Sequence, residues 1–317
     1  MKESIQKLSH IEHILKRPDS YVGPVEVTPE TYWLIDKYGK KFEKRDIKYS
    51  PALLKIFDEI LVNAVDRNSL HPKQVTNINV SIDKDSGRIT IENNGPLGGV
   101  SIKMHKKEQL WNPELTFGHL LTSTNYDDSK KRVVGGRNGY GAKLTNVYSS
   151  EFSIEIKDHE NKLSYSQMWR DNMTTCVTPT MKKYNGSKSS VSVSFIPDWK
   201  RFGMKQMDNT IFRIFHKRVY DANICTTPNC KVKFQDEPLP KMNLESYAKM
   251  YEGVESLASV TADRWSVCIG PSDNNLEQVS FVNGICTNKG GSHVDHVTSF
   301  LAAGIIDELS KKIKLKP

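Results

Sequence analysis

One twenty-residue segment, PALLKIFDEILVNAVDRNSL (51–70), sets the frame into which the rest of this sequence must fit. Pro51 suits the first turn of a helix, where the missing N–H of proline is no loss. The apolar side chains that follow recur at the i, i+3, i+4 spacing of a helix: Leu53, Ile56, Phe57, Ile60 and Ala64. Because such a helix must bury its apolar face against another element, we expect it to pack against a sheet.

Alternating apolar and polar residues predict that sheet. Residues 77–95, NINVSIDKDSGRITIENNG, have the pattern of two strands joined by the turn DKDSG. Further strand patterns occur at 151–158, 162–170, 190–199, 264–270 and 278–284, and helical patterns occur near 113–121 and at 207–222 and 293–312. The prediction is an α+β protein with an antiparallel sheet covered by helices, and a second αβ unit that begins around residue 246.

Length, charge and cysteine content narrow the class of protein. The 317 residues are enough for about two domains. No apolar run approaches the length that spans a bilayer, and the polar N-terminus is not a secretory signal. The formal net charge of +8 allows an anionic partner such as nucleic acid. Five scattered cysteines do not form a disulfide framework, and the pair Cys225 and Cys230 lacks a second ligand pair at zinc-finger spacing.

A polar stripe runs along the predicted helix. At about 100° per residue, Glu59, Asn63 and Asp66 fall within about 60° of one another. The amide oxygen of an asparagine can bind Mg²⁺, and a glutamate one turn away can polarise a water molecule. From the pattern alone, a stripe that simply faces solvent remains the alternative.

The sequence ENNG (92–95) ends a predicted strand, so its side chains are expected at a sheet edge. An asparagine or aspartate at that place can bind the exocyclic amine of a purine. Asn-Gly is also a strong turn signal, and the two interpretations stay open.

Glycines are concentrated in VVGGRNGYGAKLTNV (133–147). The spacing is not that of a P-loop, because Lys143 comes one place late and Leu144 stands where a hydroxyl is required. The dinucleotide fingerprint orders its glycines differently. Main-chain N–H groups can hold phosphates without either motif, and Lys143 is then placed to reach a terminal phosphate. A flexible loop without a ligand is the alternative.

The order of these motifs resembles that of a known family. DEILVNAVD, a strand that ends in NNG, LLTSTNYDD and GGRNGYGAK follow one another as in the N-terminal ATPase region of eukaryotic-type DNA topoisomerase II, a branch of the GHKL ATPases. IEHILKRPDSYVG (11–23) is similar to the arm of that region, and QVSFVNGICTNKGGSHVDHV (278–297) to the start of its transducer domain. The resemblance covers nearly the whole chain. It implies an N-terminal arm (1–23), a GHKL (Bergerat) α/β sandwich (24–250) and part of an S5-like transducer domain (251–317).

The resemblance also implies roles for single residues. Glu59 matches the general base and Asn63 the Mg²⁺ ligand. Asn93 matches the position that contacts adenine. The remaining ATP-binding residues carried over are Ser123, Thr124 and Asn125, followed by the lid residues Gly136, Arg137, Asn138, Gly139, Tyr140, Gly141, Ala142 and Lys143.

The implied activity is that of an ATP-operated gate. ATP binding closes a homodimer around a double-stranded DNA segment, without sequence preference, through exchanged arms and the transducer, and Mg²⁺-dependent hydrolysis reopens it. The family implies a nuclear location, or a viral or other DNA-containing compartment, and no membrane. The alternatives within the same fold are a MutL-like clamp and a chaperone of the ninety-kilodalton heat-shock type.

Three positions depart from the family pattern. Arg67 stands where asparagine is frequent, and Pro96 and Leu97 interrupt the expected N-x-G-x-G-I-P sequence. The sequence also contains neither the transducer loop with the lysine that reaches the γ-phosphate nor the cleavage domain. We therefore expect a fragment that cannot cut DNA and is impaired in hydrolysis.

Overall fold

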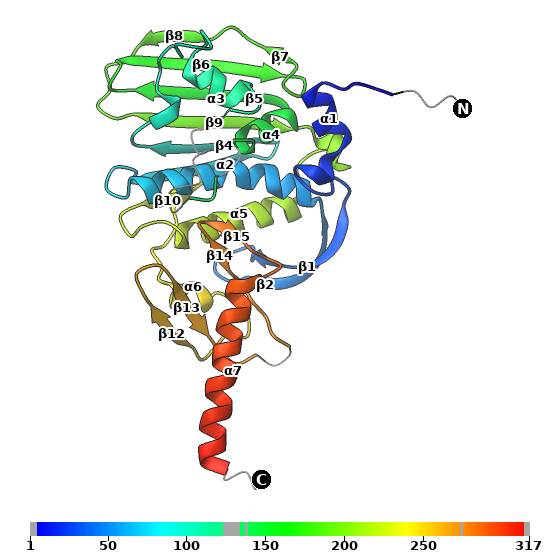
Figure 1. Cartoon of the computed structure of the whole chain (residues 1–317), viewed down its shortest axis with the longest axis vertical. Coiled ribbons are helices and arrows are strands. Elements are labelled where there is room, and N and C mark those ends of the chain that lie inside the picture. Colours follow the sequence, from blue (N-terminus) through cyan, green and yellow to red (C-terminus); the bar gives the residue numbers. More distant parts are fainter. Residues whose placement is uncertain (1–4, 123–133, 137–138, 273–274, 314–317) are drawn as a thin grey trace.

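The computed structural model describes residues 5–122, 134–136, 139–272 and 275–313 (Figure 1). In this part of the chain the main sheet has nine strands in the order β11-β10-β3-β4-β9-β5-β6-β7, with β8 also paired to β6. Its strands are β3 (Asn77–Asp83), β4 (Arg88–Asn94), β5 (Ser149–Asp158), β6 (Leu163–Arg170), β7 (Thr175–Cys176), β8 (Thr180–Lys183), β9 (Ser190–Pro197), β10 (Lys231–Phe234) and β11 (Glu237–Pro238). All the pairings are antiparallel except that of β10 with β3.

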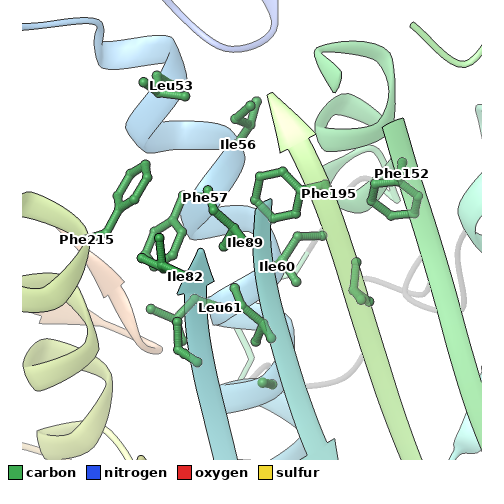
Figure 2. Close-up of a cluster of buried hydrophobic side chains, with 14 of the residues drawn as sticks. Leu53, Ile56, Phe57, Ile60, Leu61, Ile82, Ile89, Phe152, Phe195 and Phe215 are labelled. Carbon is green, nitrogen blue, oxygen red and sulfur yellow. The ribbon is translucent and has the colours of Figure 1, made fainter. Parts of the chain in front are cut away.

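The predicted helix is α2 (Pro51–Leu70), and it begins and ends at the expected residues. Together with α5 (Asn209–Ile224) it lies along one face of the sheet (Figure 1). Figure 2 shows side chains from α2, namely Leu53, Ile56, Phe57, Ile60 and Leu61, among those of four strands, namely Ile82, Ile89, Phe152 and Phe195. The rings of Phe57 and Phe215 stack with centroids 4.1 Å apart and fix α5 against α2.

Burial alternates along the strands, as expected for a sheet with one covered face. In β4 the buried positions are Ile89, Ile91 and Asn93, which therefore face the helices. The polar end of this strand thus points into the layer that contains α2. The predicted α+β architecture with a mostly antiparallel sheet is confirmed.

Residues before α2 form a separate two-stranded sheet, β1 (Thr28–Ile35) with β2 (Phe42–Tyr49), preceded by α1 (His10–Lys16) and the 3₁₀ turn η1 (Pro18–Ser20). A capping box fixes the start of α1, because the Ser9 main-chain N–H donates to Glu12 Oε2 over 2.7 Å and the Glu12 N–H donates to Ser9 Oγ. Ile14 is buried in the core, and the Tyr148 hydroxyl donates to its carbonyl oxygen over 2.7 Å. Residues 5–8 extend away from the body, and Ile5 is fully exposed (Figure 1).

Four short strands and two helices follow the main sheet: α6 (Leu244–Ala248), β12 (Ala258–Thr261), β13 (Ser266–Ile269), β14 (Phe281–Val282), β15 (Ile285–Cys286) and α7 (Ser292–Ile313). β12 pairs with β13 and β14 with β15, both antiparallel. The helix α7 projects from the body and leaves Phe300, Ile305 and Ile306 exposed (Figure 1). Among the described residues, no helix has both the length and the apolar character needed to cross a bilayer.

Short elements complete the connection between β4 and β5. They are η2 (Gly98–Val100), α3 (Asn112–Gly118) and α4 (Gly141–Val147), and η3 (Trp199–Phe202) follows β9. The strand expected at 278–284 is present only as Phe281–Val282, because Asn283 and Gly284 have φ of +50° and +77° and turn the chain at once into β15.

Candidate nucleotide site

The polar stripe of α2 is only partly exposed to solvent. Glu59 is about one-fifth exposed, and its Oε1 lies 2.5 Å from Nζ of Lys55 one turn earlier. Asn63 is exposed on the same face, whereas Asp66 is buried. The stripe is therefore not uniformly exposed, because Asp66 at its end is buried.

Glu59 lies directly against the first residue of α4. A Cβ atom built on Gly141 would collide with Oε2 of Glu59, so the carboxylate in its present position lies directly over this glycine. Thr145 holds α4 in place, because its hydroxyl donates to the Ile56 carbonyl oxygen of α2 over 2.8 Å. The glycine-rich segment therefore ends beside the carboxylate predicted to be the general base.

Lys143 is buried, with 3% of its surface exposed. Its Nζ donates to the carbonyl oxygens of Thr122, over 2.6 Å, and Gly139, over 2.5 Å. Burial lowers the pKa of Lys143 to about 8. Among the described residues its bonded partners are these two carbonyl oxygens, and an incoming phosphate would replace such neutral partners with an anion.

Asp66 binds the base of the glycine-rich segment, a role that the sequence did not suggest. Its Oδ1 accepts from the Gly135 N–H over 2.8 Å and its Oδ2 from the Gly136 N–H over 2.9 Å. The pKa of Asp66 is raised to about 6, chiefly by burial and to a smaller extent by the charge of Glu59, while the two amide hydrogen bonds act in the opposite direction. The signal was present in the stripe of α2, but its partners lie 69 and 70 residues away.

The two asparagines of ENNG have different roles. The Asn94 side chain ties the end of β4 to the start of β3, because its Oδ1 accepts from the N–H groups of Thr76 and Asn77 at 2.9 and 2.8 Å. Asn93 is buried on the side of α2, and its Nδ2 donates only a local bond to the Asn94 carbonyl oxygen over 3.1 Å. Gly95 then turns the chain with φ of +109°. Of the pair, Asn93 is the one that faces the helix layer.

Arg67, Pro96 and Leu97, the three positions that depart from the family pattern, lie together in the structure. Nη2 of Arg67 on α2 donates to the carbonyl oxygen of Pro96, and Nη1 lies 2.9 Å from where a Cβ of Gly98 would be. Gly98 also has φ of +57°. Leu97 is buried beside them. The loop after β4 is thus held by a side chain that is itself unusual for the family.

Not every predicted site residue can be placed. Ser123, Thr124, Asn125, Arg137 and Asn138 lie outside the described residues. Gly139 has φ of +66°. Tyr140 and Ala142 are partly buried against the core, and the Tyr140 ring lies 6.1 Å, centroid to centroid, from that of Tyr21. The structure therefore brings Glu59 and Gly141 into contact, with Lys143 two residues further along α4 and Asn63 one turn further along α2.

A cluster of three or more His, Cys, Asp or Glu side chains that could hold a metal ion is absent from the described ranges. This agrees with a site in which Mg²⁺ takes an amide oxygen and the oxygens of a substrate. Asn63, exposed and one turn from Glu59, fits that donor set.

Comparison with known proteins identifies the class. The fold matches the ATPase domain of Thermus thermophilus gyrase B, solved with an aminocoumarin, with a TM-score of 0.61 at 20% identity. The ATPase region of Saccharomyces cerevisiae topoisomerase II, also solved bound to dexrazoxane, matches with a TM-score of 0.92 at 40% identity over 97% of this chain and 81% of that chain. The ATPase and transducer domains of the Balamuthia mandrillaris enzyme match with 0.91 at 38% identity, over 97% and 78% of the two chains.

Curated sequences agree with the solved structures. DNA topoisomerase 2 of Meyerozyma guilliermondii is 41% identical over 99% of this chain, and that of Arabidopsis thaliana is 40% identical over 99%. No family model matches the chain.

The sheet, the α2 stripe and the glycine-rich segment define a GHKL ATPase fold. The chain belongs to the DNA topoisomerase II family and corresponds to its ATPase region. It spans about a quarter of the length of these curated relatives, 24% and 22% for the two named above. The similarity supports this assignment over a MutL-like clamp or a chaperone.

Proposed function

We propose that this chain binds ATP and supplies the residues that hydrolyse it, as the ATP-operated part of a type II DNA topoisomerase. The observation that carries the proposal is the meeting of Glu59 on α2 with Gly141 at the start of α4, two residues from the buried ammonium group of Lys143. A base, a cation and a glycine-rich main chain at one point are the parts that phosphoryl transfer to water requires.

Each residue has one task in this mechanism. Asn93 hydrogen-bonds the adenine amine at the end of β4. Main-chain N–H groups of the glycine-rich segment surround the terminal phosphates, and Lys143 exchanges the carbonyl oxygens of Thr122 and Gly139 for a phosphate oxygen. Glu59 orients the attacking water and accepts its proton, a role that contributes about 10²–10⁴ in rate. Lys55 forms an ion pair with Glu59 one turn later on the same helix.

Asn63 would hold Mg²⁺ through its amide oxygen. A Mg²⁺ ion held there would offset the negative charge of the phosphate groups. Ser123, Thr124, Asn125, Arg137 and Asn138 are proposed to complete the phosphate and ribose contacts on the basis of the family alone.

The remaining proposals concern the whole enzyme. We propose the division into an arm (1–23), an ATP-binding domain (24–250) and the start of a transducer (251–317). Two copies would close around double-stranded DNA when ATP binds, and hydrolysis would reopen them, because the closed state then loses the phosphate that it contacts. The net charge of +8 suits DNA backbone contact without sequence reading, and a nuclear or viral DNA compartment follows from that substrate.

Glu59→Gln tests the catalytic assignment. The amide keeps the size of the side chain but cannot accept the proton from water. Calorimetry with this chain should therefore show Mg²⁺-dependent binding of a non-hydrolysable ATP analogue within about twofold of the unmodified protein, while ATP turnover of the full-length topoisomerase falls about 10²–10⁴-fold.

Glu160→Gln, at an exposed turn between β5 and β6, is the matched control and should change neither quantity. Turnover at the normal rate in Glu59→Gln would remove Glu59 from its role. Absence of nucleotide binding in the unmodified chain would end the proposal.

A further inference from the structure

The turn between β14 and β15 lies against the base of the glycine-rich segment, here defined as Val134–Gly136. A Cβ atom on Gly135 would lie 2.9 Å from Cγ1 of both Val62 on α2 and Ile285 on β15, and 3.0 Å from the carbonyl oxygen of Asn283. Gly135 therefore occupies a slot with α2 on one side and the β14–β15 turn on the other. No room remains in this slot for a side chain.

Asp66 closes the slot at its inner end. Its two carboxylate oxygens accept the consecutive N–H groups of Gly135 and Gly136, as described above. On the outer side, Nδ2 of Asn283 lies 3.5 Å from the Val134 carbonyl oxygen, at the limit of a hydrogen bond. Two N–H groups and one carbonyl oxygen of Val134–Gly136 are therefore bonded by side chains that lie outside this segment.

The turn is itself fixed to the catalytic helix. A Cβ on Gly284 would lie 3.0 Å from Cγ1 of Val65 on α2. The Gly284 carbonyl oxygen accepts from Nη2 of Arg218 on α5 over 2.7 Å, and Nε of the same arginine donates to Oδ1 of Asp58 over 2.6 Å. Asp58 is the neighbour of Glu59, so one buried guanidinium joins the turn to the part of α2 that carries the general base.

We propose that Asp66 is the positioning residue for the glycine-rich segment, and that the Asn283–Gly284 turn senses where that segment lies. This deepens the proposed function and rests on it for its purpose, because the same segment is proposed to enclose the terminal phosphates. Because no space remains around Gly135 for a side chain, Gly135 cannot shift unless its hydrogen bond to Asp66 breaks or the Asn283–Gly284 turn moves with it. A change at the phosphates would thereby reach the chain beyond residue 284 through direct contact.

Amide hydrogen exchange of the nucleotide-free chain, resolved to single residues, tests the anchor. In Asp66→Asn one of the two acceptors becomes a donor, so exchange at Gly135 and Gly136 should accelerate on the order of tenfold. Asp85→Asn makes the same charge change in the exposed turn between β3 and β4 and should leave both amides unchanged. Unchanged exchange in Asp66→Asn, or equal acceleration throughout α2 and the sheet, would overturn the assignment.

A second pair of variants tests the turn. Ile285→Ala removes the side chain that closes the slot and should accelerate exchange at Gly135 and Gly136 severalfold, although it lies 150 residues further along the chain. Val282→Ala shortens an exposed side chain of the same hairpin and should not. If both variants act alike, or neither acts, the slot is not what holds the segment.

The unmodified chain supplies the measurement that needs no variant. A non-hydrolysable ATP analogue, but not ADP, should change exchange at Asn283–Ile285 together with that at Gly135–Gly136. A change at the glycines without one at the turn would overturn the sensing role.

Because the Asp66 anchor is measured without nucleotide, failure of the chain to bind ATP would reject the proposed function and would still leave the hydrogen-exchange result for Asp66→Asn interpretable. In the full-length enzyme, Asp66→Asn should lower kcat for ATP with little effect on ADP affinity, a separation that simple loss of folded protein would not give.

Discussion

At the scale of single residues, the candidate site contains two buried ionisable side chains whose hydrogen-bond partners are neutral main-chain groups. Lys143 bonds two neutral carbonyl oxygens, and Asp66 accepts from two main-chain amides near Glu59. Burial moves the pKa of each group toward neutrality, to about 8 for Lys143 and about 6 for Asp66. Groups shifted in this way respond strongly to an added charge, which is what a triphosphate brings.

The shift of Lys143 predicts how nucleotide affinity depends on pH. A phosphate favours the charged ammonium, so binding raises the pKa of Lys143 above 8 and takes up a proton at higher pH. Affinity for a non-hydrolysable ATP analogue should be highest below pH 8 and fall as pH rises through 8, by at most about tenfold per pH unit. Calorimetry between pH 7 and pH 9.5 measures this.

Stability should have the opposite dependence on pH. Since the folded-state pKa of Lys143 lies below the unfolded value near 10.5, the unfolded chain binds more protons above pH 8 and this group favours folding more as pH rises. For nucleotide binding, Lys143→Met is the control variant, and it should remove the pH dependence of analogue affinity described in the preceding paragraph. An equally steep dependence in that variant would assign the effect to another group.

The sequence singled out the candidate site residues but not all of the contacts that the structure shows for them. Glu59, Asn63 and Lys143 were found because helical spacing and glycine density are local patterns. The bonds of Asp66 to Gly135 and Gly136, and the contact of Gly135 with Ile285, join residues far apart in the chain. Contacts of that kind depend on how α2, the glycine-rich segment and β15 meet, which no local pattern contains.

At the scale of elements, α2 is both scaffold and active surface. Its apolar side chains pack against the sheet and α5 (Figure 2). Its polar stripe carries the residues proposed for the site. Its bounds were predicted because a sustained 3.6-residue period, a proline at the start and a well-filled core face all agree. The β1–β2 hairpin was not predicted, because the burial of its strands does not alternate: Glu30 and Thr31 are exposed in succession, and so are Lys44, Arg45 and Asp46.

The stacked pair Phe57 and Phe215 is the test of that scaffold. Phe57→Ala removes a fully buried ring and leaves a cavity between α2 and α5, so it should lower the free energy of unfolding by about 3–5 kcal/mol. Phe300→Ala, at an exposed position of α7, should change it by less than about 0.5 kcal/mol. Denaturant unfolding of the two variants provides the measurement, and similar losses in both would contradict the packing described.

At the scale of the molecule, two features extend away from the compact body. Residues 5–8 leave the core before α1, with Ile5 fully exposed, and α7 projects with four large apolar side chains uncovered, namely Phe300, Ile305, Ile306 and Leu309 (Figure 1). Exposed apolar side chains of this kind are candidates for contact with another chain or segment. Of the described residues of the proposed arm, 5–8 lie outside the body, whereas Ile14 is packed in the core.

Dimer formation should depend on the terminal phosphate. A non-hydrolysable ATP analogue should raise the mass of this chain measured by light scattering toward that of a dimer, while ADP should leave it lower, because only the triphosphate engages Lys143. Ile5→Ser should weaken the effect without altering analogue binding, since the side chain touches nothing in its own protomer. Unchanged mass with the analogue bound would count against arm exchange.

The Arg67 guanidinium donates to the Pro96 carbonyl oxygen and lies against Gly98, so the loop after β4 depends on the side chain at residue 67. Replacing Arg67 alone by asparagine would remove the donor to the Pro96 carbonyl oxygen and the support of the Pro96–Gly98 main chain. A chimera therefore has to exchange the arginine and the loop together, and a small molecule shaped to that loop could distinguish this chain from relatives that carry the usual sequence.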